Sequence, residues 1–252
     1  MTDQYTENYP ITRIYKNGTV STSDCLVAKE GSIELLINGI RAASILTSPA
    51  DIKELAIGYA ICEGIVQPDE IESVEVNDME VDIRISSIDE FEMWSELRSS
   101  GCVGVKWQVN EHVEVTSDAT FTPEAIFSGM EYLESDVYRL TKGTHLAALI
   151  TKEGKLAARA IDIGRHNAID KVVGHATMQG LDISKMYLLS TGRQSAGMVL
   201  KAARAGIPLI VTKSSAFDSG IEAAKRTGVG LVGFASKAKI TVFANKWRIK
   251  IE

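Results

Sequence analysis

The feature that most constrains the fold is the alternation of short apolar segments and amphipathic segments between residues 145 and 243. The apolar segments are rich in β-branched residues, as buried strands are, and the segments between them have helical spacing. Gly180, Gly206 and Gly228 stand where three of the helices should end. Strands that alternate with helices are joined by crossovers, which predicts a mostly parallel sheet covered on both faces. The expected strands are residues 145–151, 156–161, 186–189, 207–212, 229–234 and 240–243, and the expected helices are residues 168–179, 195–205 and 219–226.

The first half of the chain has a different pattern, in which hairpins dominate. Asn38 and Asn77 each open a two-residue turn signal between strand-like runs. Ser48 precedes a proline and is the expected N-cap of the first helix, whereas the first ten residues are polar and expected to be loose. The expected strands are residues 11–20, 33–46, 74–76, 79–85 and 113–116, and the expected helices are residues 49–63, 89–98 and 122–140, the last being the longest.

Turn residues at positions 117–120 separate these two patterns. A chain of 252 residues with 45% hydrophobic residues can form one large domain or two modest ones. We therefore expect a hairpin-rich α+β domain over residues 11–118 and an α/β/α domain over residues 119–252.

The overall charge excludes two broad classes of partner. A formal net charge of −6 does not suit a general nucleic-acid binder or a protein that binds anionic membranes. The chain has no apolar run of membrane-spanning length, and residues 1–8 lack the basic and apolar regions of a signal peptide. We expect a soluble cytoplasmic protein in which any anion site is a local basic pocket.

The three cysteines, Cys25, Cys62 and Cys102, are widely separated and form neither a metal-binding pair nor a disulfide framework. Cys62 lies among apolar helix residues, so we expect it in the core. Cys102 lies in a loop of small and polar residues, 99–104, where a thiolate would be accessible. It is the candidate nucleophile; the alternative is an incidental exposed cysteine.

A polar cluster occupies residues 162–167, between an expected strand and an expected helix. Open α/β sheets bind ligands at such junctions, outside the carboxyl ends of their strands. Asn167 could cap the helix, which would leave Arg165 and His166 free to contact a ligand. The alternative is an ion pair between Asp162 and Arg165 that only fixes the loop.

Two further loops, 191–195 and 213–215, follow the next strands of the expected sheet. Because parallel strands end at one edge, we expect Arg165, Arg193 and Lys213 to lie close together with several hydroxyl groups. Cations, hydroxyls and helix N-termini at one edge suit a phosphate-bearing ligand. The alternative makes Arg193 a surface residue and the serines helix caps.

The segment of residues 162–171, Asp-Ile-Gly-Arg-His-Asn-Ala-Ile-Asp-Lys, resembles the signature of the FdhD family. Members of that family are formate dehydrogenase accessory sulfurtransferases. Other family-like stretches follow one another over most of the chain: residues 48–64, 144–145, 190–195, 201–208 and 231–234.

The resemblance implies a cytidine-deaminase-like three-layer α/β/α domain in the second half, beside the smaller N-terminal α+β domain. It does not imply deaminase chemistry, which needs zinc held by histidine and cysteine with a nearby glutamate. His166 begins His-Asn-Ala instead of His-x-Glu, and no Pro-Cys-x-x-Cys follows. We therefore expect no catalytic zinc and no other metal site.

The resemblance also implies a sulfur relay. Cys102 would accept sulfur from a cysteine desulfurase as a persulfide and pass it to the bis-guanine-dinucleotide form of the molybdenum cofactor, for formate dehydrogenase. The family has a Cys-Gly-x-Cys pair in this loop, whereas Val105 stands here at the second position. The family also usually has glutamate where this chain has Ile161. An alternative is a cofactor- or guanine-nucleotide-binding chaperone or sensor that no longer relays sulfur.

The expected cofactor site combines the segment after Gly233 with the basic edge. His145 joins this set because the family has a Thr-Gly-Gly-x-His pattern there, although Lys142 replaces one glycine. We expect a homodimer. A third functional hypothesis is an unrelated enzyme that acts on phosphorylated small molecules. The expected cofactor-binding residues are Phe234, Ala235, Ser236, Lys237, Ala238, Lys239, Asp162, Arg165, His166, Arg193, Lys213 and His145.

Overall fold

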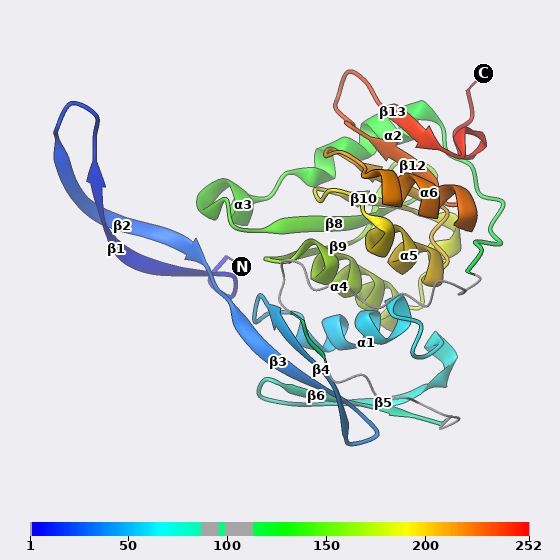
Figure 1. Ribbon diagram of the computed structural model, residues 1–252, viewed down its shortest axis with the longest axis horizontal. Helices are drawn as coiled ribbons and strands as arrows, with labels where there is room; N and C mark the ends of the chain where they lie inside the picture. The colour runs from blue at the N-terminus through cyan, green and yellow to red at the C-terminus, as the bar shows by residue number, and fades with distance from the viewer. Residues whose placement is uncertain (1, 87–95, 99–112, 252) are drawn as a thin grey trace.

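The computed structural model describes residues 2–86, 96–98 and 113–251 of the chain. In this part of the chain the strands form a two-stranded ribbon, a five-stranded sheet and a six-stranded sheet (Figure 1). The helices lie mainly around the six-stranded sheet and between it and the five-stranded sheet. No helix of the described residues is long and apolar enough to cross a membrane.

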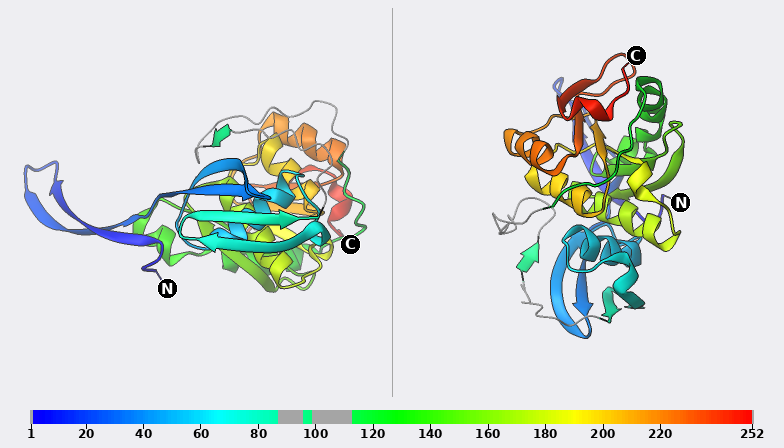
Figure 2. Two further views of the ribbon diagram at one scale, coloured as in Figure 1. Left: turned by 90° about the horizontal axis from the view of Figure 1, so that it is seen from below. Right: turned by 90° about the vertical axis from the view of Figure 1, so that its right-hand side faces the viewer.

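The N-terminal ribbon consists of β1 (Thr6–Ile14) and β2 (Val20–Ala28), which pair antiparallel over their whole length. It projects from the rest of the molecule in Figure 1 and in the left view of Figure 2, and its base lies beside α3 (Asp136–Thr141). The expectation of a loose N-terminus and of one strand over residues 11–20 was therefore wrong. A tight turn closed by Tyr15 and Thr19 reverses the chain, and Gly18 takes the positive φ of 83° that this turn requires.

The five-stranded sheet has the order β5-β6-β3-β4-β7. Asn38 and Asp78 have φ of 51° and 54° in the turns of its two hairpins, as expected from the turn signals. The strands are β3 (Gly31–Ile37), β4 (Ile40–Thr47), β5 (Ile71–Asn77), β6 (Glu80–Ile85) and β7 (Glu96–Arg98). β7 is a strand where the end of a helix was expected, and residues 89–95 of that expected helix lie outside the described residues.

Helix α1 (Ile52–Cys62) begins later than the sequence indicated. Its N-cap is Asp51, which has a φ of 55°, and not Ser48. Ser48 does not cap the helix because its backbone and side chain take part in a buried network described below. A short 3-10 helix, η1 (Pro68–Glu70), connects α1 to β5.

The six-stranded sheet has the order β13-β12-β11-β10-β8-β9. Only β10, β11 and β12 pair in parallel, so the sheet is mixed and the expectation of a mostly parallel sheet was only partly right. The tight turn at Gly154 makes β8 and β9 a hairpin, and β13 returns antiparallel to β12. The strands are β8 (His145–Ile150), β9 (Leu156–Asp162), β10 (Tyr187–Ser190), β11 (Leu209–Thr212), β12 (Gly230–Gly233) and β13 (Thr241–Ala244).

Helices cover both faces of this sheet. Helices α4 (Arg165–Met178), α5 (Ala196–Arg204) and α6 (Asp218–Thr227) pack on one face. Helix α2 (Pro123–Gly129) and the 3-10 helix η2 (Met130–Leu133) pack on the other. The described chain is therefore a mixed α/β fold with a three-layer part. Its likeness to cytidine deaminases stays a prediction.

The long helix expected over residues 122–140 is broken. A helix begins where the sequence indicated, and Thr122 caps it as α2: its Oγ1 accepts a hydrogen bond of 3.2 Å from the backbone N–H of Ala125. The chain then leaves the helix at Glu134, and Ser135 caps a separate helix, α3 (Asp136–Thr141). The expected strand at residues 113–116 is irregular, and two short 3-10 helices, η3 (Ile183–Lys185) and η4 (Lys246–Arg248), complete the elements.

The main hydrophobic core runs through both halves of the chain. It contains Ile33 and Leu35 of the five-stranded sheet, Leu55 of α1, and Val172 and Leu188 of the second half. The division at residues 118 and 119 stays a prediction about independent folding, since one continuous core joins the two sides.

Helices α1 and α4 approach each other through two glycines. A Cβ atom placed on Gly58 would overlap the carbonyl oxygen of Asp170, and one on Gly174 would overlap the carbonyl oxygen of Glu54. Only hydrogen fits at both positions, so the backbones of the two helices are in direct contact. This contact joins the five-stranded sheet to the six-stranded one (Figure 1).

We predict that Gly58→Ala destabilises the protein by about 2–3 kcal/mol, because the methyl group forces the two helices apart. Urea unfolding followed by circular dichroism measures the effect. Gly180→Ala is the control: a Cβ there meets no atom within 4 Å, and only its φ of 65° opposes the change. That strain costs about 1 kcal/mol. Equal losses in the two variants would contradict the close helix contact.

Candidate functional site

Three predicted site loops follow β9, β10 and β11, at the edge of the six-stranded sheet where β8 begins: residues 162–167, 191–195 and 213–215. Two of them contact each other or the start of β8 through hydrogen bonds. The backbone N–H of Thr191, after β10, donates to the carbonyl of Leu146 in β8 at 3.0 Å. The Thr191 hydroxyl accepts from the backbone N–H of Leu146 at 2.9 Å and lies 3.2 Å from Nδ1 of His145. The backbone N–H of Lys213, after β11, donates to the carbonyl of Ser190 at 3.2 Å.

The electrostatics of His145 show which charges gather at this edge. Burial lowers the pKa of His145, and the positive charges of Arg165, Lys213 and Arg193 lower it further, while Asp162 opposes them. His145 is therefore neutral at neutral pH, with its Nδ1 held by a hydroxyl and three cations around it.

These three cations have no carboxylate partner in the described part of the chain. The Nε of Arg165 is buried without a hydrogen-bond acceptor. The Arg165 side chain lies against Gly192, where a Cβ atom would come within 2.8 Å of the Cβ of Arg165. Arg193 and Lys213 are exposed and lie beside the aromatic rings of Phe217 and Tyr138. Such a group of unpaired cations can bind an anion.

The segment of residues 234–239 begins at the same edge. The backbone N–H groups of Phe234 and Ala235 donate to the carbonyls of Ser214 and Thr212, at 2.8 and 3.0 Å. Phe234 has a φ of 49°, which is rare for a bulky residue, and its ring is half exposed.

The rest of this segment forms an exposed turn. The backbone N–H of Ser236 donates to the carbonyl of Lys239 at 2.9 Å, which closes the turn around Lys237 and Ala238. The Lys237 ammonium lies 4.0 Å from the carboxylate of Glu134, and both are well exposed. The contacts of these lysines therefore do not place them in the cluster around His145.

Two further predicted site residues are His166 and Cys102. His166 is half-buried in the first turn of α4, next to Arg165. Cys102 lies outside the described residues, as does Val105, so the position of the proposed nucleophile relative to the cations stays a prediction.

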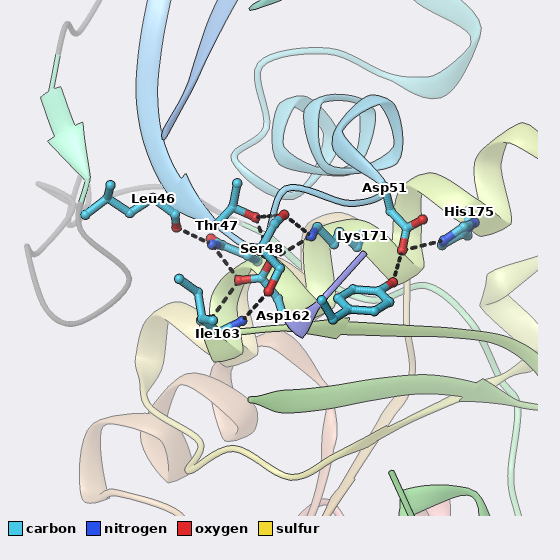
Figure 3. Close-up of polar contacts among 11 residues, drawn as sticks. Leu46, Thr47, Ser48, Asp51, Asp162, Ile163, Lys171 and His175 are labelled. Carbon is cyan, nitrogen blue, oxygen red and sulfur yellow. Dashed lines mark hydrogen bonds and ion pairs between the residues drawn. The ribbon is translucent and has the colours of Figure 1, made fainter. Parts of the chain in front are cut away.

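Asp162 is completely buried, and five donors surround its carboxylate (Figure 3). Its Oδ2 accepts hydrogen bonds from the hydroxyl of Thr47 at 2.5 Å and the backbone N–H of Ser48 at 3.0 Å, and Nζ of Lys171 lies 2.7 Å away. Its Oδ1 accepts from the backbone N–H of Gly164 at 2.7 Å and from Nδ2 of Asn167 at 2.9 Å.

This network corrects three expectations. Asn167 does not cap α4: Gly164 is the N-cap, and the Asn167 amide also donates to the carbonyl of Leu46 at 2.7 Å. Asp162 pairs with Lys171 and not with Arg165. Because its carboxylate is buried with a complete set of donors, Asp162 does not fit the predicted ligand contact. It fixes the loop that presents Arg165.

A second buried ionic cluster joins α1, α4 and α5. The Lys201 ammonium lies 2.8 Å from Oδ1 of Asp170 and 2.7 Å from Oε1 of Glu63. Burial raises the pKa of Asp170 to about 6, although the Lys201 charge opposes that shift. Cys62 lies beside this cluster, and burial raises the pKa of its thiol. Cys62 is therefore a core residue, as expected, and a poor nucleophile.

A third cluster connects the base of the ribbon to α1 and α4. The Tyr5 hydroxyl donates to Oδ2 of Asp51 at 2.6 Å, and Nε2 of His175 lies 3.7 Å from the same oxygen (Figure 3). The nearby carboxylate of Asp51 raises the pKa of His175. His175 was expected at the surface with His112; His175 is instead partly buried, and His112 lies outside the described residues.

Within residues 2–86 and 113–251, no group of three or more histidine, cysteine, aspartate or glutamate side chains is arranged to hold a metal ion. The expected absence of zinc stays a prediction, since the loop that contains Cys102 is not part of this set.

We predict that Asp162→Asn destabilises the protein by about 3–5 kcal/mol, because it leaves the buried Lys171 ammonium without its counter-charge. The double variant Asp162→Asn with Lys171→Met should recover part of this loss. Urea unfolding of both variants measures the effect. As a control, Lys185→Met removes an exposed ion pair with Asp182 and should cost no more than about 1 kcal/mol. A loss as small as the control's would show that the buried pair contributes little.

Comparison with known proteins assigns the chain to a family. The sulfur carrier protein FdhD of Wolinella succinogenes is 32% identical over 263 residues, covering 99% of this chain and 91% of that protein. The sulfur carrier protein FdhD of Methanothermobacter thermautotrophicus is 33% identical over 228 residues, covering 88% and 91%.

A crystal structure supports the same assignment. It is that of a protein from Desulfotalea psychrophila, assigned as a formate dehydrogenase accessory protein. It matches with a TM-score of 0.83 and 25% identity, covering 98% of this chain and all of that one. The model of the FdhD/NarQ family matches residues 28–250. The chain belongs to the FdhD/NarQ family.

Proposed function

We propose that this chain is a sulfur carrier that delivers sulfur to the molybdenum cofactor used by formate dehydrogenase. The observation that carries the proposal is the group of Arg165, Arg193 and Lys213 around a neutral His145, without carboxylate partners in the described chain. The chain has a net charge of −6, so a local group of positive charges favours a defined anion site over diffuse attraction of anions.

The cargo that suits this edge is the bis-guanine-dinucleotide form of the molybdenum cofactor. Its pyrophosphate groups are anionic, and guanidinium groups bind phosphate oxygens through two parallel hydrogen bonds. In this proposal Arg165 and Arg193 hold phosphate oxygens and Lys213 adds a further charge. Phe234 offers a half-exposed ring at the same edge, next to the Lys213 loop.

The sulfur itself would be carried by Cys102. A thiolate at Cys102 attacks the outer sulfur of a persulfide on a cysteine desulfurase, and the desulfurase cysteine leaves as a thiolate. Cys102 then holds the transferred sulfur as its own persulfide until the cofactor accepts it.

Val105 favours a second candidate function. If the relay needs both cysteines of the family's pair, this chain would keep the anion site and lose sulfur transfer. It would then act as a chaperone or sensor for the cofactor or for guanine nucleotides. Binding without persulfide formation would identify this case.

The partners belong to the same proposal. A cysteine desulfurase would supply sulfur, the formate dehydrogenase apoenzyme would receive the cofactor, and both exchanges would occur in the cytoplasm. We also propose a homodimer, and the ribbon of β1 and β2 is the element most available to a second subunit because it projects from the rest of the molecule (Figure 2).

We predict that the protein binds GDP, as a fragment of the cofactor, and that Arg193→Ala and Arg165→Ala each weaken this binding about ten- to a hundredfold. One charge-assisted hydrogen bond contributes about 1.5–3 kcal/mol, which corresponds to that range. Calorimetric titration at fixed salt measures the affinities. The control is Arg41→Ala, which removes an exposed arginine of the five-stranded sheet that pairs with Glu34. Affinities unchanged in both site variants would place the site elsewhere, and no binding by the wild type would overturn the proposed function.

We predict that incubation with a cysteine desulfurase and cysteine adds the mass of one sulfur atom to the peptide that contains Cys102. The addition should disappear in Cys102→Ser and persist in Cys25→Ser, because Cys25 lies in the ribbon. Intact-mass and peptide mass spectrometry measure both. Sulfur retained in Cys102→Ser would identify another carrier, whereas GDP binding with no added sulfur would support the chaperone or sensor.

A further inference from the structure

Two of the unpaired cations lie beside aromatic rings. The guanidinium carbon of Arg193 is 5.3 Å from the centre of the Phe217 ring, and Nζ of Lys213 is 5.1 Å from the centre of the Tyr138 ring. Phe217 is 37% exposed and Tyr138 is 40% exposed, so these rings are not part of the core. The proposed function gives neither ring a role.

Both rings are attached to well-fixed backbone. The N–H of Phe217 donates to the carbonyl of Gln194 at 2.9 Å, and the N–H of Gln194 donates to the carbonyl of Ser215 at 3.0 Å. Phe217 is also the N-cap residue of α6. These hydrogen bonds fix the backbone of the Arg193 loop relative to the backbone that carries the Phe217 ring.

The Tyr138 ring has a similar support in α3. The N–H of Tyr138 donates to the capping hydroxyl of Ser135 at 3.2 Å, and its carbonyl accepts from the N–H of Lys142 at 2.8 Å. The ring therefore stands on a capped helix that ends one turn later.

An aromatic ring positions a cation in a different way from a carboxylate. A carboxylate would fix Arg193 or Lys213 by an ion pair, but it would neutralise the charge and occupy the N–H groups. A ring attracts the cation through its negative face and carries no net charge. The cation keeps its full charge, and its N–H donors stay available to an anion.

A further cation, Lys142, also contacts Tyr138, and its position independently indicates an anionic ligand. Nζ of Lys142 is also 5.1 Å from the centre of this ring, so two ammonium groups share one aromatic side chain. The two positive charges repel each other, and within the described chain neither has an ion-pair partner. A phosphate oxygen bound near both would offset this repulsion.

We propose that Phe217 and Tyr138 are positioning residues of the anion site, which hold Arg193 and Lys213 in place for the ligand without neutralising them. The inference rests on the proposed function, because it assumes that these cations bind the phosphate groups of the cofactor. Neither ring needs to touch the ligand itself.

The test compares aromatic and aliphatic side chains at the two positions. Phe217→Leu and Tyr138→Leu should each weaken GDP binding about threefold to tenfold, the effect expected of one lost cation–ring contact. Phe217→Tyr and Tyr138→Phe keep a ring and should recover most of the affinity. Tyr15→Leu, which removes a half-exposed ring from the ribbon turn, is the control.

A second measurement needs no ligand. In the free protein, the NMR signals of the Arg193 Nε–H and of the Lys213 side chain should be shifted by the neighbouring ring currents. The shifts should be lost in the leucine variants and kept in the aromatic ones. Thermal unfolding checks that each variant is folded, and Phe217→Met and Tyr138→Met replace any leucine variant that is not.

The outcomes separate the inference from the proposed function. Leucine variants that bind GDP like the wild type, or aromatic variants that bind as weakly as the leucine ones, would overturn the positioning role. A wild type that binds no GDP would overturn the proposed function and, with it, the purpose assigned to the rings. Ring-current shifts that persist in that case would still establish where the rings lie.

Discussion

The ion pair between Asp162 and Lys171 is the interaction on which the functional edge depends. Both side chains are fully buried, and removing two such charges from water costs several kcal/mol for each. The cost is offset only because hydroxyl, amide and backbone donors complete the shell of the carboxylate. These donors come from β4, the loop before α1, and the start of α4, so one carboxylate fixes three segments. Arg165 begins α4 directly after Gly164, which is one of these donors, so the hydrogen bond of Gly164 to Asp162 fixes where Arg165 lies.

The buried lysines have carboxylate partners, whereas the cations at the sheet edge have none in the described chain. Lys171 and Lys201 are buried, and each lies within 3 Å of a carboxylate oxygen. Arg165, Arg193 and Lys213 stand at the edge and have none in the described chain. Charge that supports the fold is thus neutralised inside it, whereas these three edge cations keep their charge near His145. This contrast separates the structural residues of the 162–171 segment from those that can act on a ligand.

The sequence predicted what local chemistry determines and failed where distant segments decide. The hairpin turn at Asn38 and the helix start at Thr122 depend on neighbouring residues, and both were found. The second hairpin was also found, although its turn lies at Asp78 and Met79, one residue later than indicated. Asn167 looked like a cap, but its amide bonds to Leu46, 121 positions earlier in the chain, which no local pattern reveals. The convergence of the edge cations followed from strand order. Their aromatic neighbours did not, because Tyr138 and Lys213 come from elements that only the fold brings together.

The cations at this edge, which have no carboxylate partner in the described chain, also affect the stability of the protein without ligand. Like charges held close together repel, so the cations at His145 and at Tyr138 reduce the stability of the free fold. The backbone hydrogen bonds of Thr191 and Lys213, and the buried hydrogen bonds of Asp162 that fix the loop before Arg165, resist this repulsion. A bound anion would remove the repulsion and add hydrogen bonds to the same groups. The buried network is therefore what allows the edge to keep its positive charge in the free protein.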